Sequence, residues 1–113
     1  RYFIQTQLFK PYTTEDIIFF CREMPKDEIT RPIINQLIKC GTSVGANYCE
    51  ADDAESKKDF KHKIGICKKE SRESKHFLRM TAIAMPQEKD KARKLWIEAK
   101  ELNLIFNSIY NKL

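Results

Sequence analysis

Glycine and proline are scarce in this sequence, which has three glycines and four prolines among 113 residues. Both residues interrupt regular secondary structure, so their scarcity predicts long, continuous elements. Long apolar runs are missing as well, and none approaches the ~20 residues that a membrane-spanning helix needs. Since no signal-peptide pattern is visible either, we expect a protein without a membrane role.

Cysteine is present but lacks the spacing of a metal site. There is no C-x-x-C pair, and no zinc-ligand pattern joins a cysteine to a histidine. Each cysteine falls on or beside an apolar position of a helical pattern, which predicts reduced thiols that act as small apolar side chains in a cytoplasmic protein. The four are Cys21, Cys40, Cys49 and Cys67.

The sequence also lacks the short motifs of the common enzyme classes. It has no phosphate-binding loop, nucleophile elbow or dinucleotide fingerprint. The Glu-x-x-His pattern, which di-iron bundles use twice, occurs once, from Glu73 to His76. We therefore expect no catalytic activity, no cofactor and no metal. A bundle enzyme remains a third hypothesis, and it would need a metal or ligand bound in the core.

The residues that are present are typical of one globular domain over positions 1–113. Apolar residues make up 42% and charged residues 33%, a balance unlike that of a disordered chain. A chain of this length can form a single core that buries ~65% of its unfolded surface. The net charge of +5 permits an anionic partner without requiring one.

Apolar residues recur at helical spacing in four segments, and no strand pattern competes with them. Short turns join the segments, so neighbouring helices should run antiparallel. We predict an all-α fold, a left-handed, up-down-up-down antiparallel four-helix bundle. Residues 1–10 show no clean period and are open to three interpretations: an extended lead-in, a frayed turn, or a strap against a neighbouring chain. The predicted helices span about 12–24, 30–52, 57–84 and 87–112.

Polar residues mark the expected helix starts. Thr13 with Asp16, and Ser56 with Asp59, resemble capping boxes, in which a side-chain oxygen accepts a hydrogen bond from a backbone N–H three residues on. Thr30 is expected to cap the second helix in the same way.

Two glycines interrupt the helical pattern between Cys40 and Ala51. Gly41 and Gly45 should each cost ~1 kcal/mol relative to alanine. Both fall within the same arc of ~140° as the apolar residues of their helix, so they should face a packing partner. The next helix has small residues at the middle of its seam, and we expect it to cross close to the glycines. That seam is Phe60, Ile64, Cys67, Ser71, Ser74, Leu78, Thr81 and Met85.

A polar line lies on the side of the helix opposite the glycines, and its members are Gln36, Ser43, Asn47 and Glu50. Asn47 and Glu50 are the candidates for a role in binding. One interpretation is contact with a ligand or partner. The other, which we favour, is hydrogen bonding that holds the following turn or a neighbouring helix.

Positive charge is concentrated in the helix expected over 57–84. Nine basic and three acidic residues leave this segment at +6, which exceeds the net charge of the whole chain. Six of the basic residues share an arc of ~60°, which lies ~100° from the buried seam. We call these six the basic stripe: Lys57, Lys61, Lys68, Arg72, Lys75 and Arg79.

The basic stripe has three interpretations. It is a solvated helix face, a strip that contacts the phosphates of RNA or DNA, or a partner for acidic residues of a neighbouring subunit such as Asp52, Asp53 and Glu55. No aromatic residues are interleaved with these lysines along the helix, so base stacking or sequence reading is not indicated. Binding of a nucleic acid would be electrostatic and steeply salt-dependent.

Three stretches of the sequence together resemble a known family. Residues 36–51 (QLIKCGTSVGANYCEA), 56–60 (SKKDF) and 66–74 (ICKKESRES) are similar to the four-helix bundle proteins of the 23S rRNA intervening-sequence family, also described as S23 ribosomal-protein-like. The likeness covers about residues 12 to 110. The family is similar in fold to the accessory variability protein of diversity-generating retroelements. The family's motif falls on Ser43, Gly45, Ala46, Asn47, Glu50, Ala51 and Phe60.

This resemblance implies a cytoplasmic bacterial protein that assembles into a ring, commonly a homopentamer, with no established enzymatic activity. It also implies RNA, DNA, a reverse-transcriptase-like protein or a ribosomal partner as candidate ligands. We therefore predict a non-catalytic, ring-forming bundle that binds nucleic acid, with structured RNA favoured, through the basic stripe. The alternative is an oligomeric scaffold or adaptor that binds a protein partner and has no nucleic-acid role.

Overall fold

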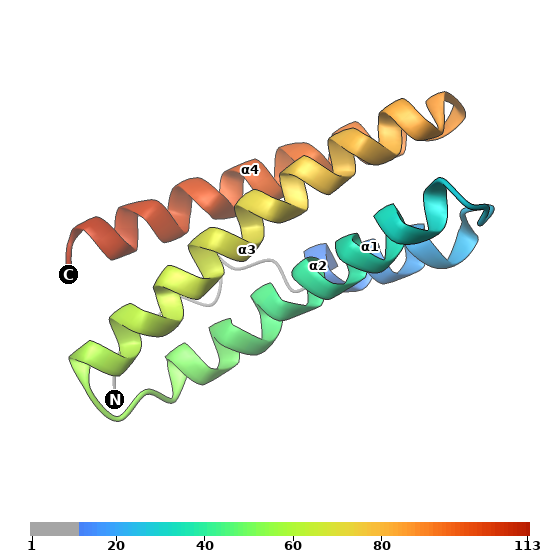
Figure 1. Ribbon diagram of the computed structural model, residues 1–113. Helices are drawn as coiled ribbons and strands as arrows, with labels where there is room; N and C mark the ends of the chain where they lie inside the picture. Colours follow the sequence, from blue (N-terminus) through green and yellow to red (C-terminus); the bar gives the residue numbers. More distant parts are fainter. Residues whose placement is uncertain (1–11) are drawn as a thin grey trace.

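The computed structural model describes residues 12–113, which form four α-helices and one short 3-10 helix (Figure 1). No strand occurs among these residues, so the fold is all-α as predicted. The interpretations of residues 1–10 lie outside the described part of the chain. In chain order the elements are α1 (Tyr12–Glu23), α2 (Thr30–Asp52), α3 (Lys57–Ala84), the 3-10 helix η2 (Pro86–Glu88) and α4 (Lys89–Asn111).

Consecutive helices pack against each other in an elongated bundle. In Figure 1, α3 turns back along α2, and α4 turns back along α3. The bundle measures 44 × 20 × 19 Å. The up-down-up-down order is compatible with this arrangement, and the left-handed twist stays a prediction. The bounds of α2 and α3 coincide with those expected from the sequence.

The two other helices differ from expectation at their ends. α1 ends at Glu23, one residue early, since Pro25 follows. The residues after Pro86 first form a 3-10 turn, in which the N–H of Glu88 donates to the carbonyl of Met85 at 2.9 Å. The α-helix therefore begins at Lys89 rather than at position 87.

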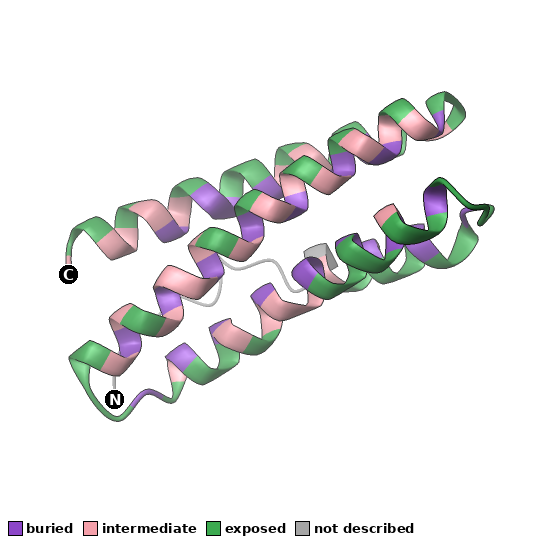
Figure 2. Cartoon of the chain, viewed as in Figure 1, coloured by how far each residue is buried: buried purple, intermediate pink, exposed green. Residues whose placement is uncertain are grey.

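All eight residues predicted for the seam of α3 are buried. Its hydroxyls are satisfied within the helix, because Ser71 donates to the carbonyl of Lys68 at 3.0 Å and Ser74 donates to that of Glu70 at 2.9 Å. Such bonds within the helix offset the free-energy penalty of burying a hydroxyl, so small polar side chains can occupy the middle of the seam. Figure 2 shows the resulting alternation of buried and exposed residues along each helix.

The core has two parts because α1 is short. Its 12 residues extend ~18 Å, whereas the 28 residues of α3 extend ~42 Å. One buried cluster draws on all four helices. Among the described residues, the other is built from α2, α3, α4 and the α2–α3 turn, with the rings of Tyr48, Phe60 and Phe106 as its largest buried members.

Both glycines of α2 lie beneath α1. A Cβ atom on Gly41 would be 2.9 Å from Cδ1 of Ile17, and one on Gly45 would be 3.1 Å from Oγ1 of Thr14. The Thr14 hydroxyl also donates a hydrogen bond of 3.3 Å to the carbonyl of Gly41. The glycines therefore let α1 approach the backbone of α2. The prediction that α3 is their partner is wrong.

Other small residues form the close contact between α2 and α3. The Ser74 hydroxyl oxygen lies 3.4 Å from Sγ of Cys40, and the Cys67 thiol lies 3.7 Å from the carbonyl of Val44. The small middle of the α3 seam thus serves a close helix crossing, as expected, but against Cys40 and Val44.

Helix caps agree with the sequence at α3 and differ at α2. Ser56 caps α3 by accepting a hydrogen bond of 3.0 Å from the N–H of Asp59. At α2, Asp27 is the capping residue, since its Oδ1 accepts hydrogen bonds from the N–H groups of Ile29 and Thr30 at 2.9 and 2.8 Å. These bonds hold the pKa of Asp27 below its usual value. The predicted Thr30 cap is wrong, because Thr30 already lies inside the helix; the Thr13 side chain is not among those described.

Candidate nucleic-acid interface

The basic stripe borders α4 at Lys61, Lys68 and Arg79. Arg72 lines a separate hollow together with Gln36 of α2 and Glu73. Lys57, Arg72 and Arg79 are exposed, whereas Lys61, Lys68 and Lys75 are half-buried. The stripe residues therefore fall into two groups. The exposed three present free charge to solvent, and the others pack against their neighbours through their aliphatic chains.

An aromatic ring of α4 lies between two lysines of the stripe. The Nζ atoms of Lys61 and Lys68 lie 4.8 and 4.3 Å from the centroid of the Tyr110 ring. Gly65 makes room for this ring, because a Cβ atom there would be 3.3 Å from Cε2 of Tyr110. Sequence reasoning found no aromatic residue among these lysines because Tyr110 comes from a different helix.

α4 adds further basic and aromatic side chains beside the stripe. Nζ of Lys100 lies 5.6 Å from the centroid of the Trp96 ring, and Arg93 and Trp96 border the same hollow as Arg79. At 100° per residue, no aspartate or glutamate of α3 or α4 falls on the arcs that carry these residues. We call this surface the α3/α4 face: the six stripe residues with Arg93, Trp96, Lys100 and Tyr110.

A buried asparagine holds the two helices of this face together. Nδ2 of Asn103 donates hydrogen bonds of 2.8 Å to the carbonyl of Lys68 and 3.2 Å to the hydroxyl of Ser71. Sequence reasoning missed Asn103, although a polar residue inside an apolar seam is a recognisable signal. Its bonds fix the separation of α3 and α4 beneath Lys68.

We expect Asn103→Ala to lower the free energy of unfolding by about 1–3 kcal/mol, because it removes a buried hydrogen-bonding group that joins two helices. Urea denaturation monitored by circular dichroism measures the change. Asn111→Ala, at an exposed position near the end of α4, is the matched control and should have little effect. Equal stabilities of the two variants would contradict the role of Asn103.

The polar residues near the glycines make contacts within the chain. Nδ2 of Asn47 donates to the carbonyl and the hydroxyl of Ser43 at 2.9 and 3.0 Å. Glu50 forms an ion pair of 3.1 Å with Lys63, which links α2 to α3. Glu50 thus has the role we favoured, contact with a neighbouring helix, whereas the hydrogen bonds of Asn47 stay within α2.

The cysteines are buried except for Cys49, which is exposed. Burial raises the pKa of the Cys21 and Cys67 thiols to about 12 and also raises the pKa of Cys40. These three thiols stay protonated near neutral pH and are poor nucleophiles. Between residues 12 and 113, no group of three or more His, Cys, Asp or Glu side chains is arranged to hold a metal ion.

Comparisons with known proteins agree with this architecture. The profile of the 23S rRNA-intervening sequence protein family matches residues 12–108. A similar solved structure is the crystal structure of a protein with unknown function from the S23 ribosomal protein family of Bacteroides thetaiotaomicron. The two chains are 25% identical, the match covers 88% of each, and the TM-score is 0.71. No curated protein matches the sequence.

No helix of the described chain is long and apolar enough to cross a membrane. With its four helices and a profile match over most of its length, this chain belongs to the 23S rRNA-intervening sequence protein family.

Proposed function

We propose that this protein binds structured RNA in the cytoplasm through the α3/α4 face, without catalysing a reaction. The observation that carries the proposal is that two helices contribute positive side chains and aromatic rings to one surface, from arcs that carry no aspartate or glutamate. Lysine and arginine side chains on such a surface neutralise phosphates and release counterions. From Lys57 to Arg79 the stripe extends ~33 Å, enough to contact several successive phosphates.

RNA is favoured over duplex DNA because of the aromatic groups. Trp96 and Tyr110 offer ring surfaces beside the basic residues, and proteins recognise unpaired bases of RNA loops and bulges by such stacking. A regular duplex keeps its bases stacked inside and gains little from exposed rings.

Self-association into a ring is part of the proposal, and the resemblance to ring-forming proteins suggests five subunits. Ile97 and Leu104 of α4 are 42% and 57% exposed, and α1 exposes Ile18 and Phe19. Apolar side chains on two helices supply candidate contacts between copies. A ring would repeat the α3/α4 face and strengthen a weak contact through avidity. The mass in solution by light scattering tests this assembly.

The expected result for RNA binding is a steep loss of affinity with salt. If all six stripe residues contact a single strand, the logarithm of the association constant should fall with that of the salt concentration with a slope of about −4, at about −0.7 per phosphate. Fluorescence anisotropy of a labelled RNA hairpin measures the slope, with duplex DNA of equal length for comparison. Absence of binding at low salt, or binding that salt does not weaken, would refute the proposal.

A scaffold or adaptor that binds another protein is the second candidate. The observation in its favour is the set of exposed isoleucines outside the α3/α4 face, among them Ile29 at 69%. A reverse-transcriptase-like or ribosomal protein would be a partner of this kind. Co-purification of one defined protein, together with no RNA binding at low salt, would favour this function.

A further inference from the structure

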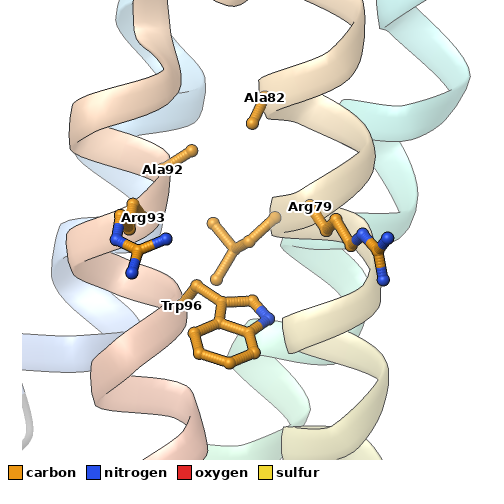
Figure 3. A pocket seen from close by; sticks show the side chains of 6 residues that line it. Arg79, Ala82, Ala92, Arg93 and Trp96 are labelled. Carbon is orange, nitrogen blue, oxygen red and sulfur yellow. The ribbon is translucent and has the colours of Figure 1, made fainter.

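A small apolar pocket lies between α3 and α4 at one end of the α3/α4 face. Its volume is about 280 Å³. In Figure 3, Arg79 and Arg93 stand on opposite sides of the hollow, and the Trp96 ring closes one end. The fully buried Leu78 also contributes to the lining. The complete lining is Leu78, Arg79, Ala82, Ala92, Arg93 and Trp96.

The pocket exists because the facing positions of the two helices carry short side chains. Ala82 and Ala92 border the hollow and leave space above the core. Trp96 is only partly buried and forms part of the pocket wall. The result is an apolar cavity with a planar ring at its end and a guanidinium group on either side.

We propose that this pocket binds one unpaired nucleobase of an RNA strand, which stacks on Trp96 while its flanking phosphates contact Arg79 and Arg93. This inference rests on the proposed RNA-binding function and names the ligand group at one point of the same face. The cavity lies at the lower limit of ligand pockets, which typically measure ~300–1,000 Å³, so it suits a single base. A planar aromatic group with an anion attached is complementary to these walls.

The position of the pocket supports the same ligand. Arg79 is both the last residue of the basic stripe and a wall of the pocket. A strand whose phosphates follow the stripe along α3 therefore reaches the pocket without leaving the positive surface. Arg93 continues the charge onto α4, so the phosphates on both sides of the inserted base have a partner.

The single tryptophan of the sequence makes the inference directly testable. A short single-stranded RNA should bind and quench the fluorescence of Trp96. An abasic strand of the same length, which keeps the phosphates but lacks the bases, should bind without comparable quenching. Equal quenching by both strands, or RNA binding with unchanged fluorescence, would overturn the base pocket while leaving the phosphate-binding function intact. If neither strand binds at low salt, both proposals fail.

Substitution gives a second test that does not rely on fluorescence. Trp96→Leu keeps an apolar side chain and should weaken binding of labelled single-stranded RNA about 5- to 150-fold, the loss expected for one stacked base. Binding of the abasic strand should not change. Ile38→Leu is the matched control, since this exposed apolar residue lies on α2, outside the α3/α4 face. Arg79→Gln and Arg93→Gln should weaken binding of both strands.

Binding of a peptide in the pocket would show that its ligand is not a nucleobase. An acidic peptide with one phenylalanine carries the same two features, an aromatic ring and negative charge. If it quenches Trp96 as strongly as the RNA at equal concentration and displaces the RNA, the pocket is not a nucleobase site. The proposal expects weak quenching and no displacement.

Discussion

Reversing three exposed charges of α3 should weaken RNA binding by ~100-fold or more. The substitutions are Lys57→Glu, Arg72→Glu and Arg79→Glu, at positions where the side chains face solvent. Each substitution removes a charged hydrogen bond to phosphate, worth about 1.5–3 kcal/mol, and adds repulsion. The slope of the logarithm of the association constant against the logarithm of the salt concentration should become shallower by about 2, at about 0.7 for each lost phosphate contact. Lys61 and Lys68 are left unchanged because they pack over Tyr110, and their loss would also disturb the α3–α4 contact.

A control variant of equal net charge distinguishes RNA binding by the α3/α4 face from general electrostatic attraction to the whole protein. Arg31→Glu, Lys39→Glu and Lys94→Glu also replace exposed basic residues, but on α2 and on the side of α4 that borders α1. Either set changes the net charge of the chain from +5 to −1, since each reversal subtracts two charges. The proposal expects the control set to retain most of the affinity. An equal loss in both sets would show that the α3/α4 face has no special role.

The largest expected loss of stability follows from Phe106→Ala. Phe106 is 1% exposed and lies in the cluster whose described members come from α2, α3, α4 and the α2–α3 turn. Truncating a buried phenylalanine typically costs about 3–5 kcal/mol, because the transfer free energy is lost and a cavity remains. Total stabilities of small domains are about 5–15 kcal/mol, so the variant should unfold at much lower urea concentration.

The matched control is Ile83→Ala on α3. Ile83 is 65% exposed, so its truncation removes little buried surface and should change the free energy of unfolding by less than about 1 kcal/mol. Urea denaturation of both variants measures the difference. Similar losses would show that the cluster around Phe106 contributes little to stability.

Periodicity along the chain was sufficient to predict the helices and the buried side of α3. The seam from Phe60 to Met85 alternates three- and four-residue steps, and every predicted member is buried. The Ser56 cap was also predictable because its bond to Asp59 spans three residues. The cap of α2 was missed, although it is equally local. Oδ1 of Asp27 accepts a hydrogen bond from the N–H of Thr30, and the Thr30 hydroxyl accepts one from the N–H of Asp27. The threonine of this reciprocal pair was mistaken for the capping residue.

The contacts that define the candidate site were not predictable in this way. Tyr110 is far in sequence from Lys61 and Lys68. Trp96 lies on α4 and Arg79 on α3, with the 3-10 helix η2 between them in the sequence. Their meeting depends on the rotation and the offset of α4 relative to α3. Bonds such as that from Asn103 to Lys68 fix these two quantities.

The sequence by itself determined the four helices, the buried face of α3 and the line of positive charge along it. These follow from the spacing of residues on one helix, which repeats every ~3.6 residues whatever lies beside it. Only the tertiary structure decided that Gly41 and Gly45 receive α1, and that aromatic rings of α4 lie among the basic residues of α3. The reason is that a helical pattern shows which side of a helix is buried, but the side chains that meet across two helices depend on how both are rotated and displaced.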